Sequence, residues 1–160
     1  RANIRVRETL SAPRTLIEAA RQKGVIFATS GEGDFIFPAF HYAPDALFAV
    51  GSFLYHLSRV GQPLSEVGRS APTVNVVHRT IPCPVEKKGR IMRQVVDRFA
   101  GRELSFLEGV KIKQDQGWVL LRPDRLGPAL HVHAEGPDQE AAAKLAASFG
   151  AQVEELVRED

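Results

Sequence analysis

One loop in this sequence combines residue types that could bind an anion. Residues 122–128 read RPDRLGP, so Arg122 and Arg125 lie three positions apart on either side of Asp124. The planar guanidinium of Arg matches the oxygens of a phosphate group, and a loop at the end of a strand is a common place for binding groups. Asp124, however, would repel a phosphate. Two interpretations therefore stay open, a phosphate-contacting loop and a charged surface turn.

Other reactive side chains give weaker signals. His131 and His133 are two apart on an expected strand and share a face, but no further Cys or His stands at a spacing that would complete a zinc site. We interpret them as a polar strand face. Cys83 lies between two prolines with no base beside it, which favours a buried structural thiol. The basic run at 87–90 (KKGR) is typical of a solvated helix face, with phosphate or an acidic partner as the alternative.

Composition limits the class of protein. In 160 residues, 44% are hydrophobic and 25% are charged, which is typical of a folded globular chain. The net charge of +2 does not indicate a nucleic-acid partner. One Cys cannot form an internal disulfide, and no apolar run is long enough for a membrane helix, so we expect a cytoplasmic protein. The only Met is Met92, so we expect the chain to be cut from a longer polypeptide.

Residues 1–67 alternate strand-like and helix-like segments, which predicts a partial α/β domain. Strands are expected at 4–6, 25–28 and 35–37, with a Gly-containing turn at 29–34 between the last two. A first helix opens at Pro13 and ends by Gly24, and a second runs from about 44 to 59. Four apolar residues of the second helix are spaced like a core stripe: Leu47, Val50, Leu54 and Leu57.

Residues 68–160 have a different order of elements. The Gly- and Pro-containing stretch 68–72 predicts a domain boundary. Strands are expected at 73–78, 108–113, 118–122 and 129–134, a hairpin turn at 115–117, and helices at 86–99 and from about 137. This order predicts a small antiparallel sheet with helices packed on one face. The whole chain is therefore α/β plus α+β.

Several motifs together resemble a known family. They are residues 81–93 (IPCPVEKKGRIMR), 108–112 (EGVKI), 117–123 (GWVLLRP) and 131–135 (HVHAE), with 35–40 (FIFPAF) and 45–49 (DALFA) further upstream. These segments resemble the C-terminal part of the α-D-phosphohexomutase superfamily, the phosphomannomutases and phosphoglucomutases. More narrowly, they look like the mutase-like region of bifunctional mannose-1-phosphate guanylyltransferases. The resemblance covers most of residues 25–150.

The resemblance implies a domain assignment and a set of site residues. Residues 1–67 would be the end of the third, sugar-binding domain, and 68–160 the fourth domain with its phosphate loop. That loop usually reads RPSGTEP in the family, so Arg122 matches, Asp124 and Leu126 replace hydroxyl residues, and Arg125 replaces a glycine. The sugar loop normally continues from Gly-Glu to Ser-Gly-His, and here only Gly-Glu with Glu32 remains. We therefore expect degenerate phosphate contacts at Arg122 and Arg125 and a degenerate sugar contact at Glu32.

The resemblance also implies where chemistry is located. The phosphoserine loop and the magnesium-binding loop of the family lie in earlier domains, so this stretch should hold neither a catalytic residue nor a metal, and magnesium is expected only in an active parent. We expect a fragment of a mutase of sugar-phosphate and nucleotide-sugar metabolism that is inactive alone. The alternative is a non-catalytic structural or regulatory module of a mannose-1-phosphate guanylyltransferase. Expected partners are a hexose phosphate bound weakly or not at all, upstream domains of the same polypeptide or further copies of it, and neither nucleic acid nor membrane.

Overall fold

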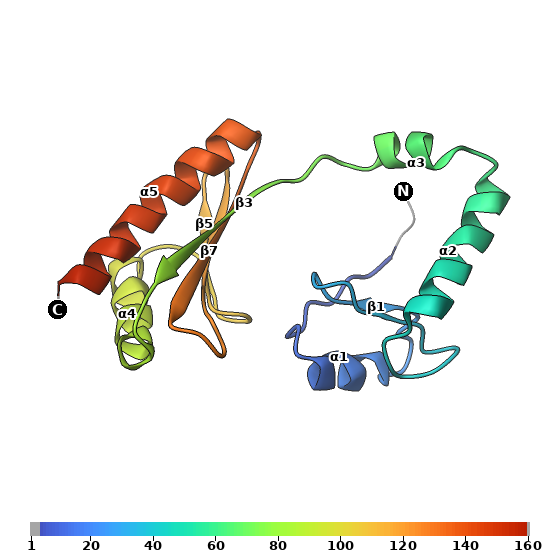
Figure 1. The fold of residues 1–160 in the computed structure, drawn as a ribbon, viewed down its shortest axis with the longest axis horizontal. Helices are drawn as coiled ribbons and strands as arrows, with labels where there is room; N and C mark the ends of the chain where they lie inside the picture. Colours follow the sequence, from blue (N-terminus) through green and yellow to red (C-terminus); the bar gives the residue numbers. More distant parts are fainter. Residues whose placement is uncertain (1–3, 160) are drawn as a thin grey trace. The chain divides into compact units, whose positions relative to one another are not determined.

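A computed structural model of the chain describes residues 4–159 and divides it into two compact units (Figure 1). Unit 1 is Arg1–Pro72 and unit 2 is Thr73–Asp160. The sequence-based boundary at 67/68 falls inside the short helix α3 (Leu64–Ser70). The Ser and Gly residues of that segment are usually turn formers, which is why composition does not predict this helix.

Unit 1 is built around one short hairpin. The helix α1 (Pro13–Ala20) begins with Pro in its first turn, and β1 (Ala28–Thr29) pairs antiparallel with β2 (Phe35–Ile36) across the expected turn. The helix α2 (Ala46–Val60) begins where the side chain of Asp45 accepts a hydrogen bond from the Phe48 N–H, and it ends at Gly61. Among residues 4–72, the buried residues are few: Leu16, Ala20 and Ile36.

Three sequence-based expectations for unit 1 are wrong. Residues 4–6 form no strand, and β1 starts only at Ala28, so Ile26 is exposed instead of buried. The expected core stripe of α2 is not covered either, because Leu47 is 88% exposed and Val50 and Leu54 are more than half exposed. The physical reason is common to all three. The described part of unit 1 has a sheet of only two short strands, which offers neither a pairing partner for further strands nor a surface for the stripe.

Unit 2 contains a five-stranded antiparallel sheet with the strand order β3-β7-β6-β5-β4. The strands are β3 (Asn75–Pro82), β4 (Leu104–Ser105), β5 (Val110–Gln114), β6 (Gly117–Pro123) and β7 (Ala129–Gly136). The first strand of the unit, β3, pairs along its whole length with the last strand, β7. Apart from the short β4, all these strands are predicted from the sequence.

Two helices cover one face of this sheet, as predicted (Figure 1). They are α4 (Val85–Arg98) and α5 (Gln139–Arg158), and α5 begins at Asp138, whose side chain accepts from the Ala141 N–H. The main core lies between helices and sheet, with Ile91 and Val95 of α4 and Phe149 and Val153 of α5 fully or almost fully buried. No helix among the described residues is long and apolar enough to cross a membrane.

The two sheet faces differ because side chains alternate along each strand. In β7, Leu130, Val132 and Ala134 are buried against the helices, whereas His131 and His133 point to the other side and are half-buried. We call this second side the helix-free face of unit 2. It carries His78 and Thr80 of β3, Trp118, Leu120 and Arg122 of β6, and His131, His133 and Glu135 of β7.

The turn between β5 and β6 depends on a glycine. Gly117 has φ +138°, a conformation that side chains rarely adopt, and a Cβ there would lie 1.9 Å from the backbone oxygen of Glu135. We expect Gly117→Ala to lower the free energy of unfolding of unit 2 by about 2–4 kcal/mol, since both the strain and the clash involve backbone. Chemical denaturation followed by Trp118 fluorescence measures this change.

The matched control for this prediction is Gly89→Ala in α4. A Cβ at Gly89 meets nothing within 4 Å, and alanine is the better helix former by about 1 kcal/mol. We therefore expect Gly89→Ala to raise stability. Equal effects of the two substitutions would contradict the role assigned to Gly117.

Candidate functional site

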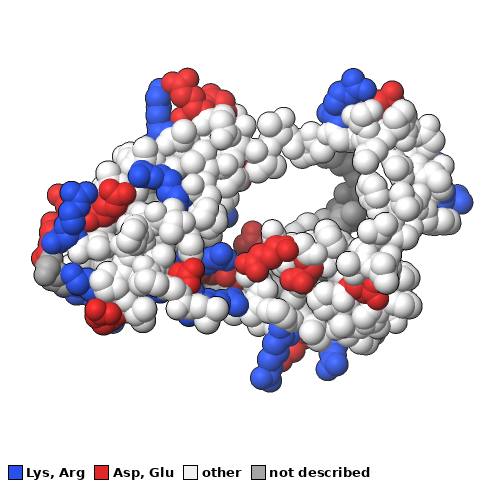
Figure 2. Space-filling view, viewed as in Figure 1, with Lys and Arg blue, Asp and Glu red and all other residues white. Residues whose placement is uncertain are grey.

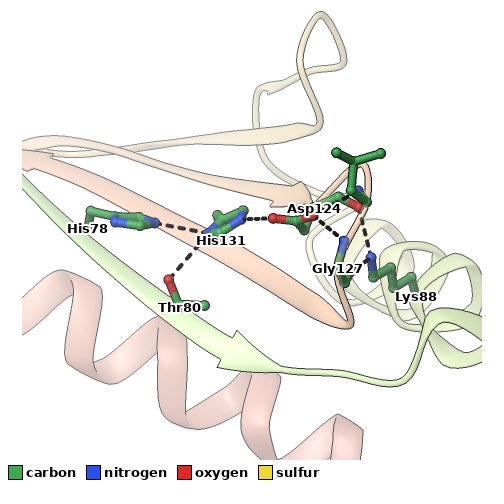
Figure 3. Close-up of polar contacts among 7 residues, drawn as sticks. His78, Thr80, Lys88, Asp124, Gly127 and His131 are labelled. Atoms are coloured by element: carbon green, nitrogen blue, oxygen red, sulfur yellow. Dashed lines mark hydrogen bonds and ion pairs between the residues drawn. The ribbon is translucent and has the colours of Figure 1, made fainter. Parts of the chain in front are cut away.

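The loop between β6 and β7 is closed around the side chain of Asp124. Its Oδ1 accepts hydrogen bonds from the N–H groups of Leu126, at 2.8 Å, and Gly127. Its Oδ2 lies 2.8 Å from Nε2 of His131 on β7 (Figure 3). Two backbone hydrogen bonds close the loop: the Asp124 N–H donates to the Ala129 oxygen, and the Ala129 N–H donates to the Gly127 oxygen. The carboxylate thus sits at the centre of a ring of donors.

A buried lysine supports the same loop from the helix side. Lys88 of α4 is only 8% exposed, and its Nζ donates to the backbone oxygens of Asp124, at 2.8 Å, and Gly127 (Figure 3). The Cys83 N–H donates to the Pro128 oxygen at 2.8 Å, which ties the end of the loop to the start of α4. The loop is therefore clamped at its base, and the charge of Lys88 lies beside the backbone that carries the anion.

The register of β3 against β7 adds further imidazoles to the site. His78 pairs with His133 and Thr80 with His131, so both pairs lie on the helix-free face. Nε2 of His78 is 3.1 Å from Nδ1 of His131, and the rings of His78 and His133 are stacked with centroids 4.6 Å apart. A continuous row of polar contacts thus runs from His78 through His131 to Asp124 (Figure 3).

The electrostatics of the site follow from these contacts. The donors around Asp124, with the Gly127 N–H first and the His131 side chain next, hold the pKa of its carboxyl far below the ordinary value. Burial, reinforced by the neighbouring His78, lowers the pKa of His133 to about 4. Burial and the nearby His131 lower the pKa of His78 as well. At neutral pH, Asp124 is therefore a carboxylate and His133 is uncharged.

The three predicted contact residues are placed differently. Arg122 lies at the end of β6 on the helix-free face, 3.9 Å from Oε2 of Glu108. Arg125 is exposed at the loop tip, next to the almost fully exposed Leu126. Glu32 is exposed in the hairpin turn of unit 1, whereas both arginines belong to unit 2.

Two members of the site are not predicted from the sequence. The basic run at 87–90 suggests a solvated face, but Lys88 stands three and seven residues before Ile91 and Val95, so it shares their buried face. That spacing is the available signal. His78 looks isolated in the sequence because only the β3–β7 register places it beside His131, and no local pattern reveals that pairing.

The remaining reactive side chains form no second site among the described residues. Cys83 is buried, as expected for a structural thiol, and burial raises the pKa of its thiol. Within residues 4–159, no group of three or more His, Cys, Asp or Glu side chains is placed to hold a metal ion. What the site can do chemically is to present N–H and guanidinium donors to an anion, and Asp124 is the anion that the ring of donors holds here.

Comparison with known proteins relates the chain to sugar-phosphate mutases. It is 33% identical over 143 residues to a probable phosphoglucosamine mutase of Methanopyrus kandleri, covering 88% of the chain and 32% of that protein. It is 30% identical over 139 residues to the probable phosphoglucosamine mutase of Thermococcus gammatolerans, covering 84% and 31%. The chain thus spans about a third of the length of these relatives. No family model matches it.

A solved structure shows the same fold. The crystal structure of a phosphoglucomutase/phosphomannomutase family protein from Burkholderia thailandensis matches with a TM-score of 0.72 at 18% identity, covering 90% of this chain and 31% of that one. Together these matches are to the C-terminal region of the phosphoglucosamine mutase and phosphoglucomutase/phosphomannomutase family.

The contacts of Lys88 lead to a stability prediction. Lys88→Met keeps the packing of the side chain against α4 but leaves two loop carbonyls without their charged donor. We expect the free energy of unfolding to fall by about 2–3 kcal/mol, as for the loss of buried hydrogen bonds to a charged group. The control Arg93→Met changes an exposed residue of the same helix and should stay within about 0.5 kcal/mol. If both variants unfold at the same denaturant concentration, Lys88 does not support the loop.

The lowered pKa of His133 leads to a pH prediction. The pKa of His133 is about 4 in the folded protein and about 6.5 in the unfolded chain. Between these two pH values the unfolded state therefore binds more protons than the folded state. Stability should therefore rise with pH across this window and be lost as the pH falls through it. His133→Gln should flatten that part of the profile in urea unfolding. An NMR titration of the native protein should give a midpoint near pH 4, and one at or above 6.5 would contradict the assignment.

Proposed function

We propose that this chain works as the C-terminal region of a phosphohexomutase-type protein of sugar-phosphate metabolism, in which unit 2 closes over a hexose phosphate. The observation that carries this proposal is the similarity to probable phosphoglucosamine mutases combined with an anion-holding loop at the end of β6. Such mutases transfer a phosphate between two positions of a sugar, so a region that contacts the phosphate has a direct use. We infer a cytoplasmic protein, in keeping with the single buried thiol.

In this proposal the chain contributes binding and orientation. Arg122 stands on the helix-free face at the mouth of the loop and offers a planar donor group suited to phosphate oxygens. Magnesium, which the family resemblance implies for an active parent, does not fit the described residues, because they include no cluster of ligands and Asp124 is committed to N–H donors.

The loop chemistry weakens the proposed contact. A hexose phosphate approaching Arg122 meets the carboxylate of Asp124, whose negative charge opposes it. Binding of a sugar phosphate by this region should therefore be weak. This same feature favours the alternative, a non-catalytic structural or regulatory module, for which a mannose-1-phosphate guanylyltransferase is the expected host. A nucleic-acid partner has no support, because charges of both signs are interspersed on the surface seen in Figure 2 and the net charge is +2.

Titration with sugar phosphates separates these two functions. We expect glucosamine 6-phosphate or mannose 6-phosphate to shift the amide NMR signals of residues 122–128. The expected dissociation constant is on the order of 1 mM, which corresponds to a binding free energy of only about −4 kcal/mol. Arg122→Ala should abolish the shifts, whereas the control Arg93→Ala should leave them unchanged. The absence of any shift in the unmodified chain would favour the non-catalytic module. Micromolar binding that requires Arg122 would refute the idea of a weakened loop.

A further inference from the structure

We propose that Asp124 is the specificity-determining residue of the 122–128 loop, because its carboxylate occupies the position where the loop would hold an external anion. This role rests on the proposed function only in that the loop is taken to be one that contacts phosphate. In every other respect the role of Asp124 is argued from the hydrogen-bond donors around the loop and from the carboxylate that accepts from them.

The first observation is that the loop's donors converge on one point. The N–H groups of Leu126 and Gly127 both point to Oδ1 of Asp124, and His131 reaches Oδ2 from the neighbouring strand (Figure 3). Successive backbone N–H groups that point to one centre form a concavity that binds anions. Here the anion is supplied by the first residue after β6, which belongs to the loop itself.

The second observation is that the internal anion is held firmly. Its donors lower the pKa of Asp124 so far that the group stays ionised at any physiological pH. An external phosphate would have to displace a carboxylate that already has three hydrogen-bond donors, and it would carry the same sign of charge. Both effects reduce its affinity, and neither can be relieved by a change of pH within the physiological range.

The third observation is that the concavity does not depend on Asp124 alone. Lys88 holds the backbone oxygens of Asp124 and Gly127 from the helix side, and the Cys83 N–H holds Pro128. These contacts fix the path of the loop without using the side chain of residue 124. The loop should therefore keep its shape when that side chain is shortened, and its N–H groups should become available to a solute.

The test compares phosphate binding before and after the carboxylate is removed. Asp124→Ser takes away the charge and shortens the side chain. Asp115→Ser is the matched control, because it removes an exposed carboxylate from the β5–β6 turn at the other end of β6. Inorganic phosphate is titrated into each ¹⁵N-labelled chain at pH 7 and constant ionic strength. The amide signals of Leu126 and Gly127 report occupation of the loop.

We expect Asp124→Ser to bind phosphate at least about tenfold more tightly than the unmodified chain, with the largest shifts at Leu126 and Gly127. The control Asp115→Ser should bind no more tightly than the unmodified chain. The proposal is overturned if Asp124→Ser keeps the sheet signals of the folded protein but gains no affinity. It is also overturned if the control gains as much, because the effect would then be one of net charge.

A second variant keeps the test decisive if Asp124→Ser does not fold. Asp124→Asn retains one oxygen that can accept from the N–H groups of Leu126 and Gly127, so the loop keeps these two bonds. The charge is lost, and an NH2 group replaces the oxygen that faces Nε2 of His131. We expect a smaller gain, about threefold, and no gain would overturn the proposal. The proposed function can fail separately, since phosphate binding by Asp124→Ser without any sugar-phosphate binding would uphold the role of Asp124 alone. Conversely, sugar-phosphate binding by the unmodified chain without a gain in Asp124→Ser would uphold only the function.

Discussion

The pairing of β3 with β7 is the constraint on which the rest of unit 2 depends. It joins the first strand of the unit to the last along eight residue pairs. The same register places His78 and Thr80 beside His133 and His131. Because α4 follows β3 directly, the pairing also brings Lys88 under the loop that precedes β7. A shift of β3 by one residue would turn His78 and Thr80 toward the core and take both from the site.

Features that depend on neighbouring residues could be predicted from the sequence, whereas contacts between residues far apart in the chain could not. Helices α4 and α5 and strands β5 to β7 are indicated by local periodicity, capping residues and a Gly-containing turn, so their prediction is confirmed. The row from His78 to Asp124 depends on a contact between His78 and His131, which are 53 positions apart, and no local pattern indicates it. Lys88 lies between these cases, because its helical spacing is informative but its charge suggests solvent.

The helix α2 of unit 1 shows that local spacing can predict an element without predicting its burial. The periodicity of α2 correctly indicates a helix, but the core that its apolar stripe predicts is not there. Whether that stripe is buried is a property of the surrounding structure, and the two short strands of unit 1 do not supply a cover. Amphipathic spacing therefore predicts the element but not its environment. The assignment of unit 1, with Glu32, to a sugar-binding domain stays a prediction.

The loop at 122–128 explains how a binding site can change its ligand while its backbone is kept. The N–H groups of Leu126 and Gly127 point to one position, so a single acceptor at the centre of the loop accepts from both. Lys88 and the Cys83 N–H hold the backbone that presents these groups, whichever acceptor is there. A hydroxyl at position 124 would leave room for a solute to complete the ring, whereas a carboxylate completes it from within. A single side chain thus decides whether the anion belongs to the protein or to its ligand.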